Sequence, residues 1–156
     1  MEPTEAVALA WLVAWLVALS VVDLRRRRLP DPMVATLLAG LVALDSASTL
    51  SGGDPLSLLW ACAGAVSYGG LLWIVYLLVP SGLGGGDVKL AVPLGWQIGF
   101  VAGTGLATAI LTALLVACLL ALVGQLVGRL LRGGWSATLA FGPSLGAGAV
   151  LVLVFA

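Results

Sequence analysis

The sequence predicts an all-α, polytopic membrane protein with about six transmembrane helices and an external N-terminus. Hydrophobic residues make up 62% of the 156 residues and charged residues only 9%, and the mean hydropathy is +1.18. Ordinary globular domains carry about 25% charged residues, so this chain lacks the side chains for a water-soluble surface. Its apolar residues form stretches of membrane-spanning length, and its basic residues are spaced so that one side of the membrane can hold them all.

The first half of the chain contains three predicted spans, since a helix that crosses the hydrocarbon core needs about 20 apolar residues. They are Ala6–Val22, Met33–Leu50 and Leu56–Val79. The sequence Pro30-Asp31-Pro32 is typical of a helix start, with Asp31 as the N-cap of the second span. The cluster at residues 51–55 is rich in Gly, Ser and Pro and indicates a turn, and Pro80 closes the third span.

The second half begins with an apolar stretch that is too long for one span. As a single helix, Val88–Val127 would extend about 60 Å, twice the hydrocarbon thickness. We therefore predict a break between Gly95 and Gly103, which leaves a short fourth span and a fifth span over Gly103–Val127. After a polar connection, Ser136–Ala156 is the predicted sixth span.

The charged residues support six spans with the N-terminus outside, because basic residues favour the cytoplasmic side of short loops. With this layout every basic residue falls inside; these are Arg25 to Arg28, Lys89, Arg129 and Arg132. Four acidic residues fall outside, namely Glu2, Glu5, Asp45 and Asp54. Merging the fourth and fifth spans would move Arg129 and Arg132 outside, so six is the better count.

Composition also removes several classes of site. The chain has no histidine, so the usual general base, the Ser-His-Asp triad and most zinc sites are excluded. Cys62 and Cys118 lie on separate apolar segments and are expected to be small core residues, which gives a poor metal site. No metal and no cofactor are expected. Seven basic and seven acidic residues balance, and nothing in the charge predicts a nucleic-acid partner.

Two aspartates at the cytoplasmic boundary are the candidate catalytic residues. Asp23 closes the first span and Asp87 opens the fourth, and an ionisable group at a span end near other helices is a functional candidate. Each has a structural alternative: Asp23 as a partner of the arginines, and Asp87 as a helix cap. The presence of two carboxyl groups on one side of the membrane, with glycines beside one of them, favours chemistry.

The glycines Gly84, Gly85 and Gly86 stand directly before Asp87. A phosphate-binding loop would place Lys and then Ser or Thr after its last glycine, whereas Asp87 follows here and no Ser or Thr comes after Lys89. Glycine also allows another backbone to approach closely. An extended peptide at the membrane edge needs such an approach, because its amides must find hydrogen-bond partners.

Three motifs resemble those of the type IV prepilin peptidases. Gly84-Gly85-Gly86-Asp87-Val88-Lys89 matches their Gly-x-Gly-Asp-x-Lys signature, and Asp23-Leu24-Arg25 through Leu29-Pro30-Asp31 is similar to their aspartate that precedes Pro-Asp or Pro-Asn. Phe141-Gly142-Pro143 resembles their Phe-Gly-Pro near the last span. The motifs occur in order over nearly the whole chain, which looks like one peptidase domain over residues 1–156.

The resemblance implies an aspartic endopeptidase of the bacterial inner membrane, whose active site faces the cytoplasm and removes the basic leader of pilin-like precursors. Its catalytic pair corresponds to Asp23 and Asp87. Substrate binding or loop support is expected from the other motif residues, which are Gly84, Gly85, Gly86, Lys89, Phe141, Gly142 and Pro143. The chain is most similar to the short peptidases of Flp/Tad pilus systems. It starts at the family's core region, so the methylation performed by larger members is not expected.

Two aspartates suffice for peptide hydrolysis if one ionised carboxylate takes a proton from water and a protonated partner polarises the carbonyl. The helix dipole favours the anion at Asp87, at a helix N-terminus, and disfavours it at Asp23, at a helix C-terminus. We therefore predict Asp87 as the base. Lys89 either snorkels to the lipid headgroups, which are expected contacts of the protein, or acts on the aspartate pair or the substrate.

Two other functions compete with the peptidase. A small proton- or ion-coupled transporter or channel could relay ions through the same aspartates, although such proteins usually hold acidic groups near the bilayer midplane. A structural subunit of a secretion machine would need neither aspartate. The sequence gives no indication of oligomeric state.

Overall fold

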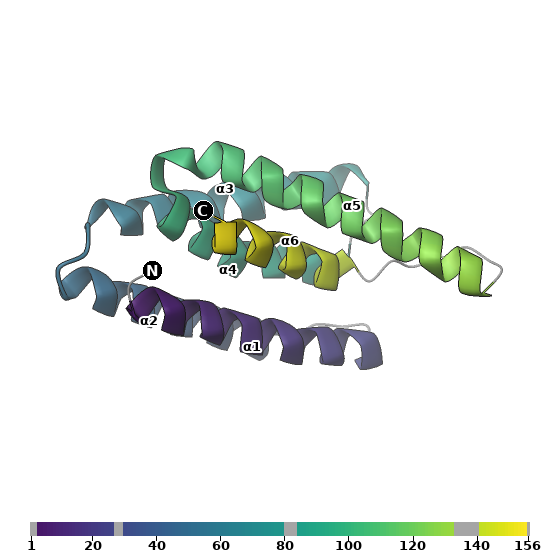
Figure 1. The fold of residues 1–156 in the computed structure, drawn as a ribbon, viewed down its shortest axis with the longest axis horizontal. Coiled ribbons are helices and arrows are strands. Elements are labelled where there is room, and N and C mark those ends of the chain that lie inside the picture. Colours follow the sequence, from purple (N-terminus) through teal and green to yellow (C-terminus); the bar gives the residue numbers. More distant parts are fainter. Residues whose placement is uncertain (1–2, 27–29, 80–83, 133–140, 156) are drawn as a thin grey trace.

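The computed structural model describes residues 3–26, 30–79, 84–132 and 141–155, which form six α-helices and one 3₁₀ turn (Figure 1). The helices are α1 (Pro3–Arg26), α2 (Asp31–Leu50), α3 (Leu56–Leu78), α4 (Gly85–Ala102), α5 (Leu106–Arg132) and α6 (Phe141–Phe155), and the turn η1 is Gly103–Gly105. The described residues contain no strand. The prediction of an all-α fold is confirmed for this part of the chain.

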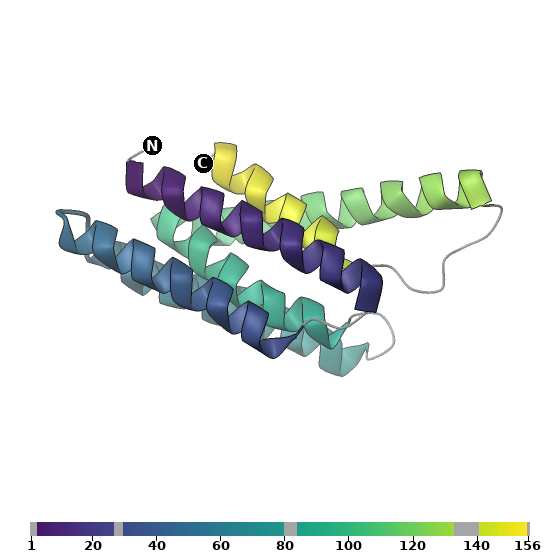
Figure 2. The same cartoon turned by 90° about the horizontal axis from the view of Figure 1, so that it is seen from below.

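The six helices run along one common direction and alternate up and down through the chain (Figures 1 and 2). Helix α4 lies at the centre and contacts α2, α3, α5 and α6, whereas α1 packs against α2 and α6. The C-terminal part of α5 extends beyond the ends of its neighbours. Because the helices alternate in direction, the end of α1 and the starts of α2, α4 and α6 lie at one end of the bundle.

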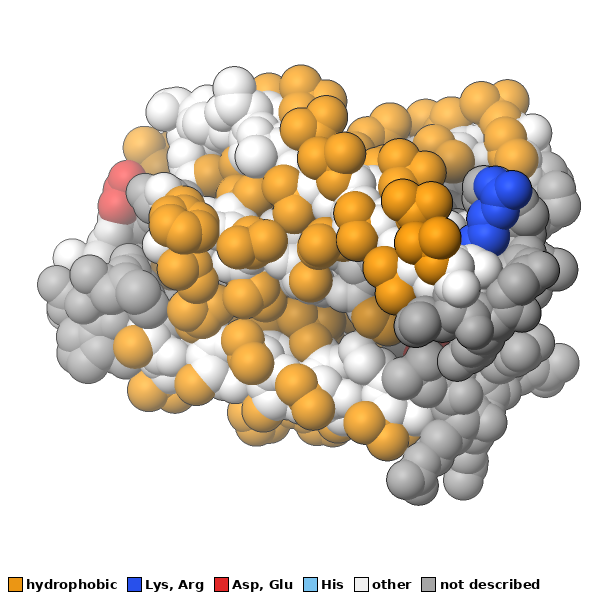
Figure 3. Space-filling model, turned by 45° about the vertical axis from the view of Figure 1, so that its right-hand side comes forward, with side chains coloured by type: hydrophobic (Ala, Val, Ile, Leu, Met, Phe, Trp, Pro, Cys, Tyr) orange, Lys and Arg blue, Asp and Glu red, His pale blue; other side chains and the backbone are white. Residues whose placement is uncertain are grey.

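The exterior of the bundle is apolar enough for lipid. Four stretches of the described chain are long and apolar enough to cross a membrane: Ala6–Asp23, Asp31–Leu50, Leu56–Leu78 and Gly85–Leu130. The last includes both α4 and α5, and α6 is apolar but shorter at 15 residues. Figure 3 shows apolar side chains over most of one face, with basic and acidic groups at opposite ends. The length and composition of these helices indicate a membrane protein.

The predicted break in the long apolar stretch occurs at Gly103, the C-terminal limit of the predicted region. Helix α4 ends at Ala102, and Gly103 has a φ of 51°, a conformation that glycine adopts at little cost. Gly95 does not break the helix, because it lies where α4 packs against α3. The fourth helix therefore has 18 residues and begins at Gly85 rather than at Val88.

Most predicted boundaries are close to the observed ones. Helix α1 extends beyond Ala6–Val22 in both directions, and α3 ends one residue before the predicted Val79. The predicted start of the sixth span at Ser136 lies outside the described residues, as do Arg27 and Arg28.

Two sequence-based expectations are wrong. Asp31 is not an N-cap, since Pro30 holds that position without a side-chain hydrogen bond and Asp31 is the first helical residue. Cys62 and Cys118 are exposed rather than in the core. In a membrane protein the surroundings are as apolar as the interior, so an apolar mid-helix residue has no preference for the core.

Trp96 lies inside the bundle, where its indole N–H donates to Asp45 Oδ2 at 2.8 Å. Asp45 is 2% exposed and sits near the C-terminal end of α2, away from the end that holds the candidate aspartates. The sequence predicts Asp45 on the external side of the membrane. The structure joins Asp45 and Trp96 in a part-buried contact between α2 and α4.

Candidate active site

Asp87 is held in place by the start of α4. It is the third helical residue, and its Oδ2 accepts a hydrogen bond from the backbone N–H of Gly84 at 3.3 Å. The Asp87 N–H in turn donates to the Gly84 carbonyl at 3.0 Å. The residue is buried, at 6% exposure. The structural alternative considered for Asp87, a helix cap, is therefore part of its role, and one of its carboxylate oxygens remains for other contacts.

Asp23 approaches the same glycine of α6 as Asp87. It lies in the last turn of α1 and is half-buried. A Cβ at Gly142 would lie 3.1 Å from Asp87 Oδ1 and 3.6 Å from Asp23 Oδ2, so these two oxygens are no further apart than the sum of the two distances. The fold thus brings together the two aspartates that the sequence singled out, although they are far apart along the chain.

The start of α6 separates the two helices that carry the aspartates. Helix α6 contacts both α1 and α4, whereas α1 and α4 do not pack directly on each other in the described part of the chain. Gly142 is buried between the carboxylates. Phe141 packs against the core and Pro143 follows in the first turn, where the missing N–H of proline is tolerated.

The glycine segment forms a helix start rather than a long loop. Gly84 is the N-cap, and Gly85 and Gly86 belong to the first turn of α4. A Cβ at Gly85 would meet open space, so a second backbone can approach the helix start at this position. Residues 80–83, which precede this turn, lie outside the described residues.

Lys89 forms an ion pair with Asp31. Its Nζ contacts Asp31 Oδ1 at 2.5 Å, and both side chains are largely exposed. Snorkelling to the lipid headgroups is one role that the sequence predicts for Lys89, and Asp31 is predicted there only as a cap. The contact joins the starts of α2 and α4, and the motifs alone carry no signal for it, because the two residues belong to different motifs.

Chemically, the arrangement offers two carboxyl groups on either side of a small gap. Among the described residues, no group of three or more His, Cys, Asp or Glu side chains could hold a metal ion. Two carboxyl groups at this separation suit the activation of a water molecule between them.

Comparison with protein families gives one match. The model of the type IV leader peptidase family matches residues 10–126, a region that contains Asp23, Asp31, Asp87 and Lys89 but not Gly142. Neither the curated proteins nor the solved structures give a match. Because the family model covers most of the sequence, and both aspartates lie within the matched region, the chain belongs to the type IV leader peptidase family.

Proposed function

We propose that this protein is an aspartic endopeptidase that removes the basic leader from type IV pilin-like precursors, with Asp23 and Asp87 as its catalytic residues. The observation that carries the proposal is the approach of both carboxylates to Gly142. Membership in the leader peptidase family supplies the reaction class. The approach of the two carboxylates supplies a way to perform the reaction without histidine, serine or a metal.

The proposed reaction uses one water molecule between the two side chains. The ionised carboxylate takes a proton from the water, whose oxygen attacks the scissile carbonyl carbon. The protonated carboxyl donates a hydrogen bond to the carbonyl oxygen, which gains negative charge. When the tetrahedral intermediate collapses, the C–N bond breaks, and the proton taken from water passes to the leaving amine.

We assign the ionised base to Asp87, because two local interactions favour its anion against the burial of the side chain, which disfavours it. The backbone N–H of Gly84 donates to its Oδ2, and such a bond favours the carboxylate form. Asp87 also lies in the first turn of α4, where the positive end of the helix dipole favours an anion. Asp23 lies in the last turn of α1, where the dipole acts in the opposite sense, and is the proposed acid.

The proposed topology places the aspartate pair at the cytoplasmic face of the bacterial inner membrane. Each of the six helices crosses once, and the external N-terminus starts α1. Arg26 and Arg132 end α1 and α5, and Lys89 lies in the first turns of α4, so the basic residues gather at the same end as the aspartates. An excess of basic residues on the cytoplasmic side is typical of membrane proteins.

This position fits a precursor with a charged leader and an apolar helix that starts near the cut. The leader stays in the cytoplasm while the apolar segment remains in the membrane. Cleavage at the boundary avoids moving charged residues into lipid, which costs about 2.5 to 3.5 kcal/mol for each residue on insertion scales.

The proposal is tested by co-expression with a candidate precursor and by cleavage in reconstituted membranes. We expect Asp23→Asn and Asp87→Asn each to lower kcat/KM by at least about 10³-fold, because each removes one half of the proton transfer. Asp54→Asn is the matched control, since Asp54 is an exposed carboxylate before α3 whose Oδ1 accepts from the Leu56 N–H. It should cleave like the wild type.

The result can also contradict the proposal. Wild-type cleavage by either Asp→Asn variant, with the protein folded, would exclude the pair as the catalytic residues. Ion flux through vesicles that requires both aspartates, with no precursor cleaved, would favour the transporter instead.

The assignment of acid and base has its own measurement. Carboxyl-carbon NMR of aspartate-labelled protein, assigned with the two Asn variants, should show the protonated carboxyl at Asp23 at neutral pH. A protonated Asp87 beside an ionised Asp23 would reverse the two roles and leave the pair intact.

A further inference from the structure

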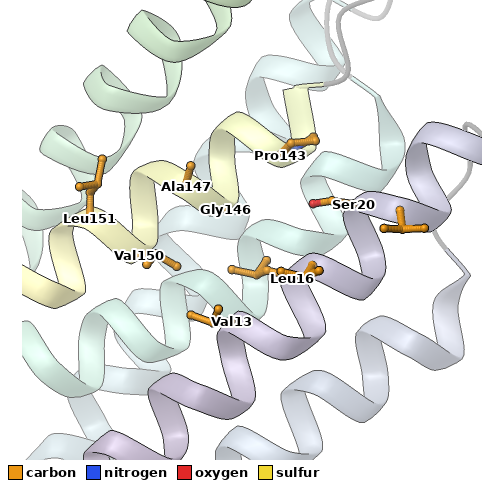
Figure 4. Close-up of a pocket in the computed structure, with 10 residues that line it drawn as sticks. Val13, Leu16, Ser20, Pro143, Gly146, Ala147, Val150 and Leu151 are labelled. Carbon is orange, nitrogen blue, oxygen red and sulfur yellow. The ribbon is translucent and has the colours of Figure 1, made fainter.

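A groove of about 460 Å³ runs between α1 and α6 (Figure 4). Its described lining residues come from these two helices; they are Val13, Leu16, Val17, Ser20 and Val21 from α1, and Pro143, Gly146, Ala147, Val150 and Leu151 from α6. Val17 is 60% exposed, so the groove opens sideways, toward the lipid. The only polar side chain among the lining residues is Ser20.

The walls of the groove have the shape that receives a helix. Val13, Val17 and Val21 recur every four residues on α1, and Pro143, Ala147 and Leu151 do so on α6. Side chains four apart form the ridges along which one helix packs into another. Small residues on one wall, Gly146 and Ala147, allow a close approach, as they do at helix contacts in membranes. The row from Val13 to Val21 is about 12 Å long, or two helical turns.

One end of the groove reaches the aspartate pair. Ser20 is three residues before Asp23, which places both on the same side of α1. Pro143 directly follows Gly142, and Figure 4 shows Ser20 and Pro143 at the same end of the groove. From this end the groove leads along the helices, away from the bundle end that holds the starts of α2, α4 and α6.

We infer that this groove binds the apolar helix of the precursor, in the two turns that follow the cut. The inference rests on the proposed function. A peptide whose scissile bond lies between Asp23 and Asp87 must leave the pair in two directions. The basic leader goes to water, and the apolar segment goes along the membrane, where the groove between α1 and α6 begins.

The walls also define the chemistry of the occupant. None of the described lining residues is charged, so we expect the occupant to be uncharged over these two turns. Ser20 can donate to a backbone carbonyl at the point where the extended peptide becomes helical. The rows of side chains spaced four residues apart fit the ridges of a helix better than a flexible lipid chain. We expect small or β-branched residues on the face of the precursor helix that binds the groove.

Cysteine cross-linking tests the contact directly. The background carries Cys62→Ala and Cys118→Ala, which remove the exposed native thiols, and Asp87→Asn, which keeps the precursor uncut. Val17→Cys should form a disulfide with a precursor cysteine placed in the first two turns after the cut, with a helical repeat of three to four residues. Val66→Cys is the matched control, because Val66 is an exposed valine on α3, at 75% exposure, and should give no cross-link.

Kinetics of the active enzyme give a second measurement. Val17→Trp fills the groove and should lower kcat/KM about tenfold or more, mainly by raising KM, whereas Val66→Trp should change it less than about twofold. A short soluble peptide that carries the cut site without the apolar helix should be cleaved equally by the wild type and Val17→Trp. Size-exclusion profiles in detergent check that each variant is folded.

The outcomes separate this inference from the proposed function. If the wild type cleaves precursor, and Val17→Cys gives no cross-link while Val17→Trp is as active as Val66→Trp, the groove is not the docking site and the peptidase stands. A Val17→Cys disulfide between two copies of the protein that persists with precursor present would assign the groove to a dimer and overturn the inference. If the wild type cleaves no precursor, both proposals fail.

Discussion

The interface of α3 with α4 and the interface of α1 with α6 use the same residue type, glycine, with opposite results. On the first, a Cβ at Gly64 would lie 2.1 Å from the carbonyl oxygen of Gly95, and one at Gly99 would lie 2.1 Å from that of Trp60. These two backbones are in contact. On the second, a Cβ at Gly146 would meet only the end of the Leu16 side chain, at 3.1 Å.

The difference follows from what faces each glycine. Gly95 and Gly99 are four residues apart and face Gly64 and Ala61 across the contact, a pattern of small residues that draws membrane helices together. On α1 the larger side chain of Leu16 faces Gly146, and Val13, Val17 and Val21 line the open groove beside it. A stripe of glycines therefore closes an interface only where the partner helix is also small.

The candidate aspartates are divided between these two regions. Asp87 starts the helix that is fixed against α3, and its carboxylate is held by the Gly84 N–H. Asp23 ends the helix that borders the groove and is half-buried. One carboxylate is thus fixed by the scaffold, while the other lies where the proposed substrate enters.

The closed interface should break with a single methyl group. In Gly64→Ala the new Cβ meets the Gly95 carbonyl, and a backbone cannot yield as a side chain can. We expect the free energy of unfolding to fall by about 3 kcal/mol, as measured by SDS titration in mixed micelles and circular dichroism.

Gly70→Ala is the control on the same helix. A Cβ there meets nothing within 4 Å, so we expect a change within about 1 kcal/mol, toward higher stability because alanine favours the helix. Equal destabilisation by both variants would mean that the contact between α3 and α4 is not the rigid part of the bundle.

The gap between the aspartates should respond to Gly142→Ala. The added methyl would lie 3.1 Å from Asp87 Oδ1, so the carboxylate must shift by a few tenths of an ångström. Because small misplacements of reacting groups are costly, we expect kcat/KM to fall between about ten- and a hundredfold with little change in stability. Gly124→Ala, on α5 with nothing within 4 Å of its Cβ, should cleave like the wild type.

The Gly142→Ala variant also tests whether Gly142 sets the separation of the two carboxylates or only packs the helices together. Activity that is unchanged in Gly142→Ala would show that the carboxylates do not need the separation seen at α6. A loss of folded protein, rather than of activity, would instead make Gly142 a packing residue like Gly64.

Much of the fold was predictable because hydrophobic length and the location of charge act locally. Helices and turns were placed to within a few residues, and the break near Gly103 followed from the length of the apolar stretch alone. The exact position was not predictable. Gly95 and Gly103 look alike in sequence, and only packing against α3 keeps Gly95 within the helix.

The candidate site was predictable from its motifs, and its surroundings were not. Motif residues gave Asp23, Asp87 and Gly142, and topology placed the aspartates at one end of the bundle. The contacts of Lys89 with Asp31 and of Trp96 with Asp45 join different segments. The groove beside Ser20 depends on which faces of α1 and α6 meet, and hydrophobicity does not fix that rotation, since every face of these helices is apolar.

The smallest effect is expected at the contact of Lys89 on α4 with Asp31 on α2. Both groups are largely exposed, and exposed ion pairs contribute about 1 kcal/mol or less. We expect Lys89→Gln and Asp31→Asn each to destabilise the protein by no more than this, with kcat/KM lowered less than about fivefold. The double variant should be no worse than either single one, which a double-mutant cycle measures.

The cycle separates the two roles of Lys89 that the sequence left open. If Lys89 acts only by joining the starts of α2 and α4, Asp31→Asn must reproduce the whole effect of Lys89→Gln on cleavage. A loss of about a hundredfold in Lys89→Gln alone, with Asp31→Asn near the wild type, would mean that Lys89 leaves Asp31 when substrate binds and contacts the reacting groups. The start of α4 would then be mobile during the reaction, and the fixed position of Asp87 would hold only for the free enzyme.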